Sequence, residues 1–427
     1  MNTSPTKTAS PADLTAGAPR CRICDTRLTH TVVDLGMSPL CESVVLPSQL
    51  DQAETFYPLH VRVCDECFLV QLPAHVAPAE IFEEYAYFSS TSSSWLQHAS
   101  DYAAEMAAAL GLGPDSLVAE VASNDGYLLS NFVRMGVPVI GIEPARNVAA
   151  TARERGVDTH CAFFGAETAA LVREERGAAD LIAANNMFAH VPDIHDIAEG
   201  FKVLLAPDGM LTIEFHHLVR LIEGDQFDTI YHEHYSYLSL HTAQRVLADH
   251  GLEVVDVREL RSHGGSLRVY AQHEGRGAPS ARVAELLERE RAGGFMTLQP
   301  YEAFGARVAA SKRALLNHLI ASRDAGRAVV GYGAPGKSVT LLNYCGIGTD
   351  LLDFTVDRNT YKQGTYMPGV RIPVRPVEAI DEHRPDEIVI LPWNLEREIS
   401  QQLAHTAEWG ARLVVPIPHP RIVDAAR

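Results

Sequence analysis

Basic residues and long apolar runs are both scarce in this 427-residue sequence. Lys and Arg together number 36 against 54 Asp and Glu, which leaves a formal net charge of −18 at pH 7. Such an acidic chain presents no basic field to gather phosphates, which argues against nucleic acid as a partner. Apolar stretches of the ~18 residues that a membrane-spanning helix needs are absent, so we expect no transmembrane helix and no membrane partner.

The first residues of the chain lack the apolar segment of a secretory signal and are rich in Ser, Thr, Ala and Pro. We therefore expect a disordered leader over residues 1–20 and a cytoplasmic protein. The chain is too long for one core, and its 46% hydrophobic content fits a globular enzyme of two or three domains. The sequence carries no legible sign of an interface between copies, and we expect a monomer.

Cysteine is also scarce, at seven residues, but four of the seven form two C-x-x-C pairs. These four are Cys21, Cys24, Cys64 and Cys67. Two such pairs on short turns are the usual way to offer four thiolates tetrahedrally to Zn²⁺, and we predict a structural zinc site in a domain over residues 21–80. The alternatives are a redox pair or two disulfides, which a chain without a secretory signal disfavours. We expect the scattered Cys41, Cys161 and Cys345 to be buried or incidental.

Strand-like and helix-like segments alternate from about residue 97 to residue 275. The strand-like segments are 117–122, 137–143, 179–185 and 210–215. Such alternation predicts a parallel sheet covered by helices on both faces. Segments 252–257 and 266–272, joined at Gly264-Gly265, then predict an antiparallel pair, as in the methyltransferase variant of the doubly wound fold. We place this central domain at residues 81–280.

A second α/β pattern follows a helical stretch over residues 281–326, and we place the two together in a C-terminal domain at 281–427. Its expected strands are 328–333, 351–357, 387–392 and 413–416. The overall fold class is therefore α/β, with two Rossmann-like domains after a small metal-binding one.

The first strand of the central domain runs into the segment E-V-A-S-N-D-G at 120–126. Ligands of open α/β sheets lie beyond the carboxyl ends of the strands, so this turn can approach an adenosine. Glu143 ends the second strand, 23 residues after Glu120, and an acid there can bind both ribose hydroxyls. Because Ala122 and Asn124 stand where a stricter motif has glycine, an ordinary strand–turn–helix remains the alternative.

A cluster of titratable residues, Y-H-E-H-Y at 231–235, follows the fourth strand, and His190 follows the third. Imidazole can take up a proton near neutral pH while Tyr and Glu orient it, so we favour an acid–base cluster. The alternative is a metal site on His232 and His234, whose H-x-H spacing can chelate. Glu233 between them would point away, which disfavours that alternative.

In the C-terminal domain, G-x-G-x-x-G at 331–336 follows a strand and opens a helix that begins with Lys337. Backbone amides there and the Lys337 ammonium could meet a pyrophosphate. Lys362 and Asn394 could also face a ligand. Asp357 ends the next strand, where a dinucleotide fold places a ribose-binding acid, so NAD binding and a purely structural turn both remain alternatives.

The chain carries, in order, the C-x-x-C pairs, Y-x-Y-F-S-S at 85–90, E-V-A-S-N-D-G at 120–126, A-H-V-P-D at 189–193 and Y-H-E-H at 231–234. This ordered set of motifs resembles the sugar C-methyltransferases of deoxysugar antibiotic pathways. The resemblance spans about residues 21 to 420. It implies a class I S-adenosylmethionine (SAM) methyltransferase domain between the zinc domain and a C-terminal domain that binds a dTDP-linked ketosugar. The implied reaction transfers a methyl group from SAM to carbon 3 of a dTDP-linked 4-ketosugar.

The resemblance and the motifs together give three sets of expected site residues, with His234 as the general base. Around the sugar we expect Tyr85, His190, Tyr231, Glu233 and His234. Around SAM we expect Tyr87, Phe88, Ser90, Glu120, Ala122, Asn124, Gly126, Glu143, Asn185 and Asn186. Around the nucleotide we expect Tyr332, Gly333, Ala334, Lys337, Asp357, Lys362 and Asn394.

The chemistry fits these residues, because a ketone lets the carbanion at a neighbouring carbon delocalise onto oxygen as an enolate. A base must face that carbon, and donors must face the ketone oxygen, each worth on the order of 3 kcal/mol in the transition state. Carbon 5 of the same sugar also lies beside the ketone, so methylation there is an alternative. An NAD-dependent sugar oxidoreductase and a zinc-containing scaffold that senses SAM are the remaining alternatives. The sequence leaves open whether carbon 3 bears an amine or a hydroxyl.

Overall fold

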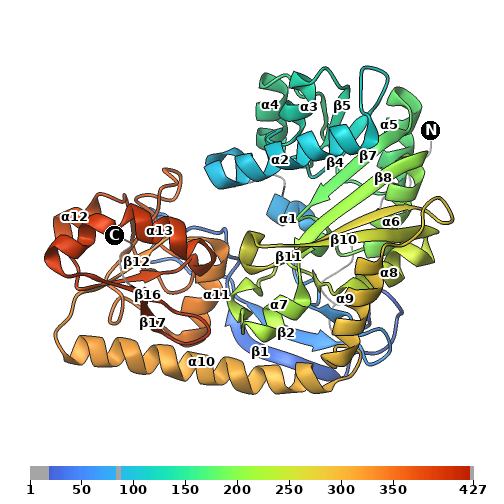
Figure 1. The fold of residues 1–427 in the computed structure, drawn as a ribbon. Coiled ribbons are helices and arrows are strands. Elements are labelled where there is room, and N and C mark those ends of the chain that lie inside the picture. Colours follow the sequence, from blue (N-terminus) through green and yellow to red (C-terminus); the bar gives the residue numbers. More distant parts are fainter. Residues whose placement is uncertain (1–18, 83–87, 424–427) are drawn as a thin grey trace.

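The computed structural model describes residues 19–82 and 88–423 (Figure 1). Nearly all of the expected leader, together with Tyr85 and Tyr87, lies outside these residues. The described residues form three sheets, which agrees with the expected fold class of a small N-terminal domain followed by two α/β domains. Among the described residues, no helix is both long enough and apolar enough to cross a bilayer.

The N-terminal sheet is antiparallel and contains a strand from a distant part of the chain. Its order is β1 (His30–Ser38), β2 (Tyr57–Val63), β3 (Val70–Gln71) and β9 (Ser236–Tyr237). A short helix, α1 (Pro78–Phe82), follows. In β2, alternate residues Leu59, Val61 and Val63 are buried, the period of a strand with one face on a core. Because β9 pairs with β3, this sheet is completed by the segment that directly follows the expected acid–base cluster.

The central sheet has seven strands in the order β10-β11-β8-β7-β4-β5-β6. Its strands are β4 (Val118–Val121), β5 (Val139–Ile142), β6 (Thr159–His160), β7 (Ala179–Asn185), β8 (Leu205–His216), β10 (Leu252–Leu260) and β11 (Ser266–His273). The helices between them are α2 (Ser93–Leu110), α3 (Leu129–Arg134), α4 (Arg146–Glu154), α5 (Ala166–Arg176), α6 (Ile194–Leu204), α7 (Leu218–Glu223) and α8 (Leu240–Asp249). Only β11 runs antiparallel to its neighbours within this sheet, which confirms the methyltransferase variant of the doubly wound fold.

Two helices, α9 (Ala281–Ala292) and α10 (Gln299–Asp324), make up the helical stretch expected over 281–326. They are separate because Gly293 and Gly294 end α9, Gly294 with φ +80°, and Pro300 stands in the first turn of α10. In Figure 1, α10 runs along the N-terminal sheet and the C-terminal domain.

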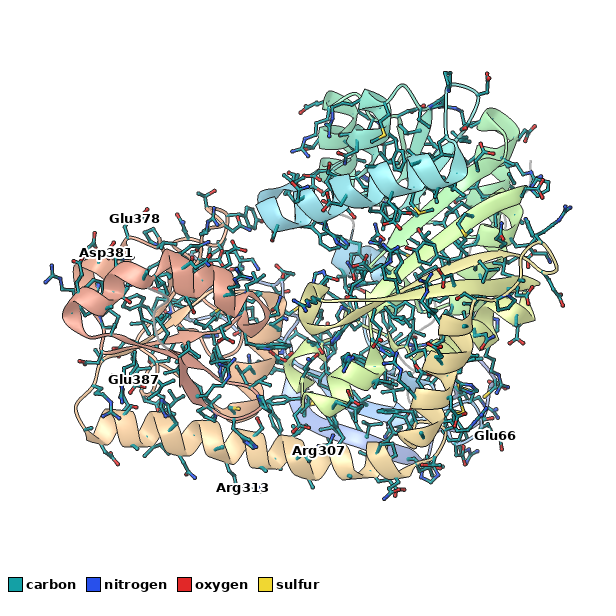
Figure 2. All side chains as sticks on the ribbon, in the orientation of Figure 1. Glu66, Arg307, Arg313, Glu378, Asp381 and Glu387 are labelled. Carbon is teal, nitrogen blue, oxygen red and sulfur yellow. The ribbon has the colours of Figure 1, made fainter. Side chains whose placement is uncertain are left out.

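Charged groups join α10 to the domains on either side of it. Arg307 donates through Nε to Asp225 Oδ1 at 2.8 Å, and so attaches α10 to the central domain. In the C-terminal domain, the buried Glu387 accepts from His318 Nε2 at 2.8 Å and Ser322 Oγ at 2.9 Å, both on α10. Figure 2 labels Arg307 and Glu387. Through these contacts α10 fixes the position of the C-terminal domain relative to the other two.

The C-terminal sheet has the order β14-β13-β12-β15-β16-β17. Its strands are β12 (Val329–Tyr332), β13 (Thr355–Val356), β14 (Val374–Arg375), β15 (Glu387–Ile390), β16 (Arg412–Val415) and β17 (Arg421–Val423). Its helices are α11 (Gly336–Cys345), α12 (Ala379–His383) and α13 (Glu396–Gln402). Five strands are parallel and β17 is antiparallel, which confirms a Rossmann-like domain.

Candidate functional site

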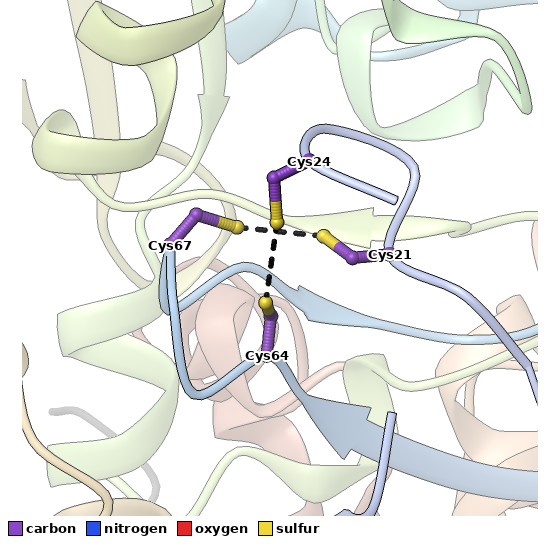
Figure 3. Close-up of side chains that lie close together, drawn as sticks. All are labelled: Cys21, Cys24, Cys64 and Cys67. Atoms are coloured by element: carbon purple, nitrogen blue, oxygen red, sulfur yellow. Dashed lines mark hydrogen bonds between the residues drawn. The ribbon is translucent and has the colours of Figure 1, made fainter. Parts of the chain in front are cut away.

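The four expected zinc ligands lie together between two turns of the N-terminal domain (Figure 3). Their sulfur atoms all lie within 4.8 Å of one another, with Cys21 to Cys67 at 3.4 Å and Cys24 to Cys64 at 3.5 Å. Gln71 Nε2 donates to the Cys21 sulfur at 3.2 Å. This four-sulfur set fits a closed tetrahedral site.

The protonation chemistry of these thiols also fits a bound cation. Burial raises the pKa of Cys64 to about 11. The hydrogen bond between Cys21 and Cys67 lowers the pKa of Cys21 to about 4 and raises that of Cys67. Four thiolates this close repel one another unless a divalent cation stands between them. Cys21, Cys24, Cys64 and Cys67 would hold Zn²⁺ in a structural role, because four protein ligands leave no open coordination position.

Among the described residues, these cysteines are the only group of three or more His, Cys, Asp or Glu side chains placed to hold a metal ion. His232 faces away from the cluster of candidate catalytic residues and contacts the carbonyl oxygen of Pro58 at 3.3 Å. The structure therefore does not support the alternative of a metal on His232 and His234.

One cavity of about 1100 Å³ lies where the carboxyl ends of the central strands meet the C-terminal domain. It is lined by fourteen of the expected site residues: Phe88, Ala122, Asn124, Glu143, Asn185, Asn186, His190, Tyr231, Glu233, His234, Lys337, Asp357, Lys362 and Asn394. Six others do not line it: Ser90, Glu120, Gly126, Tyr332, Gly333 and Ala334. The cavity is large enough for a cofactor and a substrate together, since single-ligand pockets are roughly 300–1,000 Å³.

At the end of the cavity where SAM is expected, the turn after β4 has a left-handed backbone at three positions, and only one of them is a glycine. Ala122 has φ +56°, Asn124 +49° and Gly126 +77°. Glu143 braces this turn, because its carboxylate accepts from the backbone N–H of Asn124 and of Ala145, each at 2.9 Å. A left-handed residue other than glycine costs roughly 1–2 kcal/mol, so the brace holds a strained loop in place.

Glu143 also has the features expected of a ribose ligand. It is buried at the end of β5, it lines the cavity, and burial raises its pKa. A carboxylate has about four acceptor positions, so two remain after the two backbone bonds. The residues present therefore fit SAM, and Glu143 is the residue that would hold its ribose.

Glu120 lies beneath this turn and is fully buried. Burial raises the pKa of its carboxyl, which lies beside Tyr127, well above the usual range. The segment of residues 88–90 lies over the same turn: Ser89 N–H donates to Asn124 Oδ1 at 2.8 Å, and Ser90 N–H to Asp125 Oδ2 at 3.3 Å. Contact of Glu120 and Ser90 with the cofactor stays a prediction; in this structure the backbone of Ser90 bonds to the loop and its hydroxyl accepts from Arg155 Nη2 at 3.0 Å.

The expected acid–base cluster is assembled in the middle of the cavity. The His234 Nδ1–H donates to the carbonyl oxygen of Thr229 at 2.8 Å. The rings of Tyr231 and His190 lie 4.0 and 4.6 Å from the His234 ring, centroid to centroid. Burial lowers the pKa of His234 well below its usual range and that of His190 to about 4, so both rings are neutral near pH 7.

Two polar residues of the N-terminal domain, Cys41 and Glu42, line this cavity in addition to the site residues that the sequence identified. The Cys41 thiol donates to Glu233 Oε1 at 3.1 Å, and the Glu42 carboxylate pairs with Lys362 Nζ at 2.8 Å. Burial raises the pKa of Cys41 well above its usual range, so the thiol keeps the proton that it donates. Neither residue belongs to a motif, and only the fold brings the loop after β1 to the site.

At the nucleotide end, Lys337 Nζ donates to Asn394 Oδ1 at 2.8 Å, and both side chains line the cavity. The amides of Gly333 and Ala334 already donate, to the carbonyl oxygen of Val356 and to Asp357 Oδ2, each at 2.6 Å. An anion would therefore meet the Lys337 ammonium at the start of α11 and not these two amides. 

Tyr332 donates its hydroxyl to Gln402 Oε1 at 2.7 Å and does not line the cavity. The contact expected between Tyr332 and the nucleotide remains a prediction, and in this structure its hydroxyl serves the packing of the C-terminal domain.

Comparison with known proteins agrees with this architecture. Residues 21–82 match a family described as a candidate zinc binding domain, residues 95–257 a methyltransferase domain, and residues 261–418 a C-methyltransferase C-terminal domain. C-methyltransferase NovU from Streptomyces niveus is 38% identical over 421 residues, which cover 97% of this chain and 99% of that protein.

Two solved structures align at low identity. A SAM-dependent methyltransferase from Clostridium acetobutylicum is 12% identical, with 42% of this chain and 92% of that chain covered and a TM-score of 0.35. The glycopeptide N-methyltransferase MtfA in complex with SAM is 15% identical, with coverages of 41% and 94% and a TM-score of 0.33. The assignment of this chain to a family therefore rests on the full-length relative and the three domain matches.

The order of the central strands, the cavity at their carboxyl ends and the full-length match define a class I methyltransferase with two added domains. The chain belongs to the SAM-dependent C-methyltransferases, and it carries the zinc-binding domain of that family at its N-terminus.

Proposed function

We propose that this enzyme methylates carbon 3 of a dTDP-linked 4-keto-deoxysugar, in deoxysugar and antibiotic biosynthesis. The observation that carries the proposal is the hydrogen bond from His234 Nδ1–H to the carbonyl oxygen of Thr229. It fixes the tautomer of a neutral ring, so Nε2 is the basic nitrogen of a side chain that lines the cavity. A general base in this state suits removal of a proton from a carbon acid.

The chain's own residues perform the proton transfer. His234 Nε2 takes the proton from carbon 3. The electron pair of that C–H bond forms the double bond between carbons 3 and 4 of the sugar, as the 4-ketone becomes an enolate. SAM, when bound, supplies an electrophilic methyl group, whose carbon forms the new bond to carbon 3 as its bond to sulfur breaks. The proton remains on His234 until solvent removes it.

Tyr231 and His190 lie close enough to serve as donors to the 4-oxygen, because their rings adjoin the His234 ring. Burial raises the pKa of Tyr231 well above the usual range, which keeps its hydroxyl proton available for donation. Tyr85, also expected in this role, lies outside the described residues. Glu233 is held by Cys41 at the same wall and is placed to orient the sugar.

A cation at one end of the cavity supports an anionic substrate. Lys337 lines the cavity in a chain whose net charge is −18, whereas Lys362, which also lines it, is paired with Glu42 at 2.8 Å. A local cation is what a nucleoside diphosphate requires in an otherwise acidic protein. This end of the cavity therefore suits the dTDP group, with the sugar extending toward His234.

The test is incubation of the purified enzyme with methyl-labelled SAM and a panel of dTDP-4-ketosugars that carry an amine or a hydroxyl at carbon 3. Mass spectrometry should show one added methyl group, and NMR should locate it at carbon 3. A methyl group at carbon 5 would retain the enolate chemistry and correct the position. Absence of methyl transfer to every ketosugar, or calorimetric binding of NAD, would overturn the proposal.

A further inference from the structure

The segment of residues 228–230, here called the bridging segment, is bound from the C-terminal domain on both sides. The Trp393 indole Nε1–H donates to Asp228 Oδ2 at 2.6 Å. The Thr340 hydroxyl, on α11, donates to the carbonyl oxygen of Ile230 at 2.7 Å. Asp228 is fully buried and Thr340 is 2% exposed. Loss of either hydrogen bond would therefore leave a buried polar group that water does not reach.

The residue between these two anchors carries the carbonyl that orients the base. Thr229 accepts the Nδ1–H of His234 through its carbonyl oxygen at 2.8 Å. Its own hydroxyl donates to the carbonyl oxygen of Gln226 at 2.7 Å. The direction of the Thr229 carbonyl is therefore fixed by its two neighbours in sequence, each of which is held by the C-terminal domain.

Trp393 is in turn held by the nucleotide end of the cavity. Lys337 Nζ lies 4.7 Å from the centre of the indole ring, in the geometry of a cation–π contact. On the side of the central domain, a side chain at Gly264 would place its Cβ 2.4 Å from Trp393 Cη2. The indole is thus inserted tightly between the expected anion-binding lysine and the central domain.

We propose that Trp393 and Thr340 are positioning residues, through which the C-terminal domain sets the orientation of His234 by way of the bridging segment. The inference rests on the proposed function of His234 as the base. Its physical basis is that a base must lie within hydrogen-bond reach of the proton, and a displacement of about 1 Å can cost about 10²-fold in rate. The domain that receives the nucleotide would then also orient the catalytic group.

The Thr340 hydroxyl provides the cleaner experiment. Thr340→Val keeps the shape and removes one hydrogen bond, and we expect kcat to fall about tenfold while the KM values for SAM and ketosugar stay within about twofold. Thr340→Ser restores the donor and should restore kcat. The matched control is Thr406→Val in the same domain, since Thr406 is fully buried, donates to the Leu403 carbonyl oxygen at 2.7 Å and lies outside the cavity lining. It should leave kcat unchanged.

Trp393→Phe tests the other anchor with dTDP alone as the probe. It should lower both kcat and the calorimetric affinity for dTDP, because Asp228 loses its donor and Lys337 loses the indole face, whereas Thr340→Val should leave dTDP affinity unchanged. Wild-type kcat in both variants would overturn the inference.

A readout without turnover separates this inference from the proposed function. Ring ¹⁵N shifts of His234, assigned by their loss in His234→Asn, report which nitrogen bears the proton. Thr340→Val should lower the fraction of the Nδ1–H tautomer, and an unchanged fraction would overturn the positioning role even if no ketosugar proves to be a substrate. Inactive wild-type enzyme with the expected shifts would instead overturn the proposed function alone.

Discussion

His234 combines the two properties that a general base needs. Its ring lines the cavity, and its Nδ1–H is engaged by the Thr229 carbonyl, which leaves Nε2 to accept a proton. The Y-H-E-H motif identified the candidate residues, but the choice between two histidines needed the contacts. His232 contacts the carbonyl oxygen of Pro58 and does not line the cavity.

We expect His234→Asn to bind SAM and dTDP normally and to lower kcat by about 10²–10⁴-fold, as for loss of a general base. The Asn side-chain amide can still donate to the Thr229 carbonyl, so the fold should be kept. The measurement is steady-state kinetics with the ketosugar that the wild type methylates. His232→Asn is the control that should retain turnover. Near-normal turnover in His234→Asn together with loss in His190→Asn or Tyr231→Phe would move the base to one of those neighbours.

Glu143 braces the loop after β4, and we propose that it also binds the ribose of SAM; one substitution tests both roles through two separate measurements. In Glu143→Ala the ribose hydroxyls of SAM lose their acceptor, and the affinity should fall by roughly 1.5–3 kcal/mol. The amides of Asn124 and Ala145 lose their acceptor as well, so the free energy of unfolding should fall by about 1–3 kcal/mol. Calorimetry and urea denaturation measure the two. Lower stability with unchanged SAM affinity would show that Glu143 only braces the loop.

His232 should make unfolding sensitive to acid. Burial lowers its folded-state pKa to about 4, below the ~6.5 of an unfolded histidine, so between these values the unfolded chain binds a proton that the folded protein does not. Stability is therefore lost as pH falls through 6.5. From pH 7 to 5.5 this group should cost about 1 kcal/mol.

The measurement is urea denaturation of the wild type and His232→Asn at pH 7 and pH 5.5. Other groups titrate equally in both proteins, so the difference between their pH dependences isolates His232. Equal pH dependence in the two would show that folding does not lower the pKa of His232.

The turn after β4 shows how an element can reach a conformation that its sequence does not favour. Ala122 and Asn124 take left-handed φ values, and Gly126 is the one glycine among the three left-handed positions of the turn. At Gly126 an added Cβ would lie 2.9 Å from Val157 Cγ2. This glycine is therefore required by both its backbone conformation and its packing.

We expect Gly126→Ala to lower the free energy of unfolding by more than Gly136→Ala does. Gly136 is the matched control, because it has φ +76° beside +77° for Gly126, yet nothing lies within 4 Å of its added Cβ. Backbone strain alone should cost about 1 kcal/mol at Gly136, and the contact with Val157 should add about 1–3 kcal/mol at Gly126. Denaturant titration measures both, and equal losses would mean that Val157 moves aside freely.

The zinc domain is joined to the catalytic loop, so the metal should affect more than its own sheet. Arg22, between the two cysteines of the first pair, donates to the carbonyl oxygens of Leu72 and Tyr235 and to Ser236 Oγ. Ser236 lies in β9, which pairs with β3 of the zinc domain. Loss of the zinc site should therefore loosen the residues that directly follow His234.

Metal analysis should find about one zinc per chain. Cys24→Ser should lower the zinc content and the melting temperature, and should lower kcat while SAM affinity is largely kept, because the cofactor loop lies in another domain. Cys161→Ser, an exposed cysteine outside the cluster, is the control and should change none of these. Metal-free protein with an unchanged melting temperature would contradict a structural zinc.

Much of the fold was predictable because the patterns that specify it are short. Four cysteines at two C-x-x-C spacings bind one metal wherever their turns meet, and the strand ends at Glu120 and Glu143 follow from alternating apolar segments. The helical stretch over residues 281–326 was predicted as well, whereas its division into α9 and α10 at Gly293 and Gly294 was seen only in the structure. Local conformation depends on residues a few positions apart, and these can be read directly.

The sequence alone determined the three domains, the zinc ligands, the cofactor loop and the histidine cluster. The tertiary structure alone decided that β9 completes the zinc sheet, that Cys41 bonds to Glu233, and that Trp393 reaches Asp228 across 165 positions of the chain. No spacing rule connects such residues, because their contact depends on how whole domains pack against α10 and the cavity walls. The chemical groups are local features of the sequence, whereas their alignment in one cavity is a result of packing between distant segments.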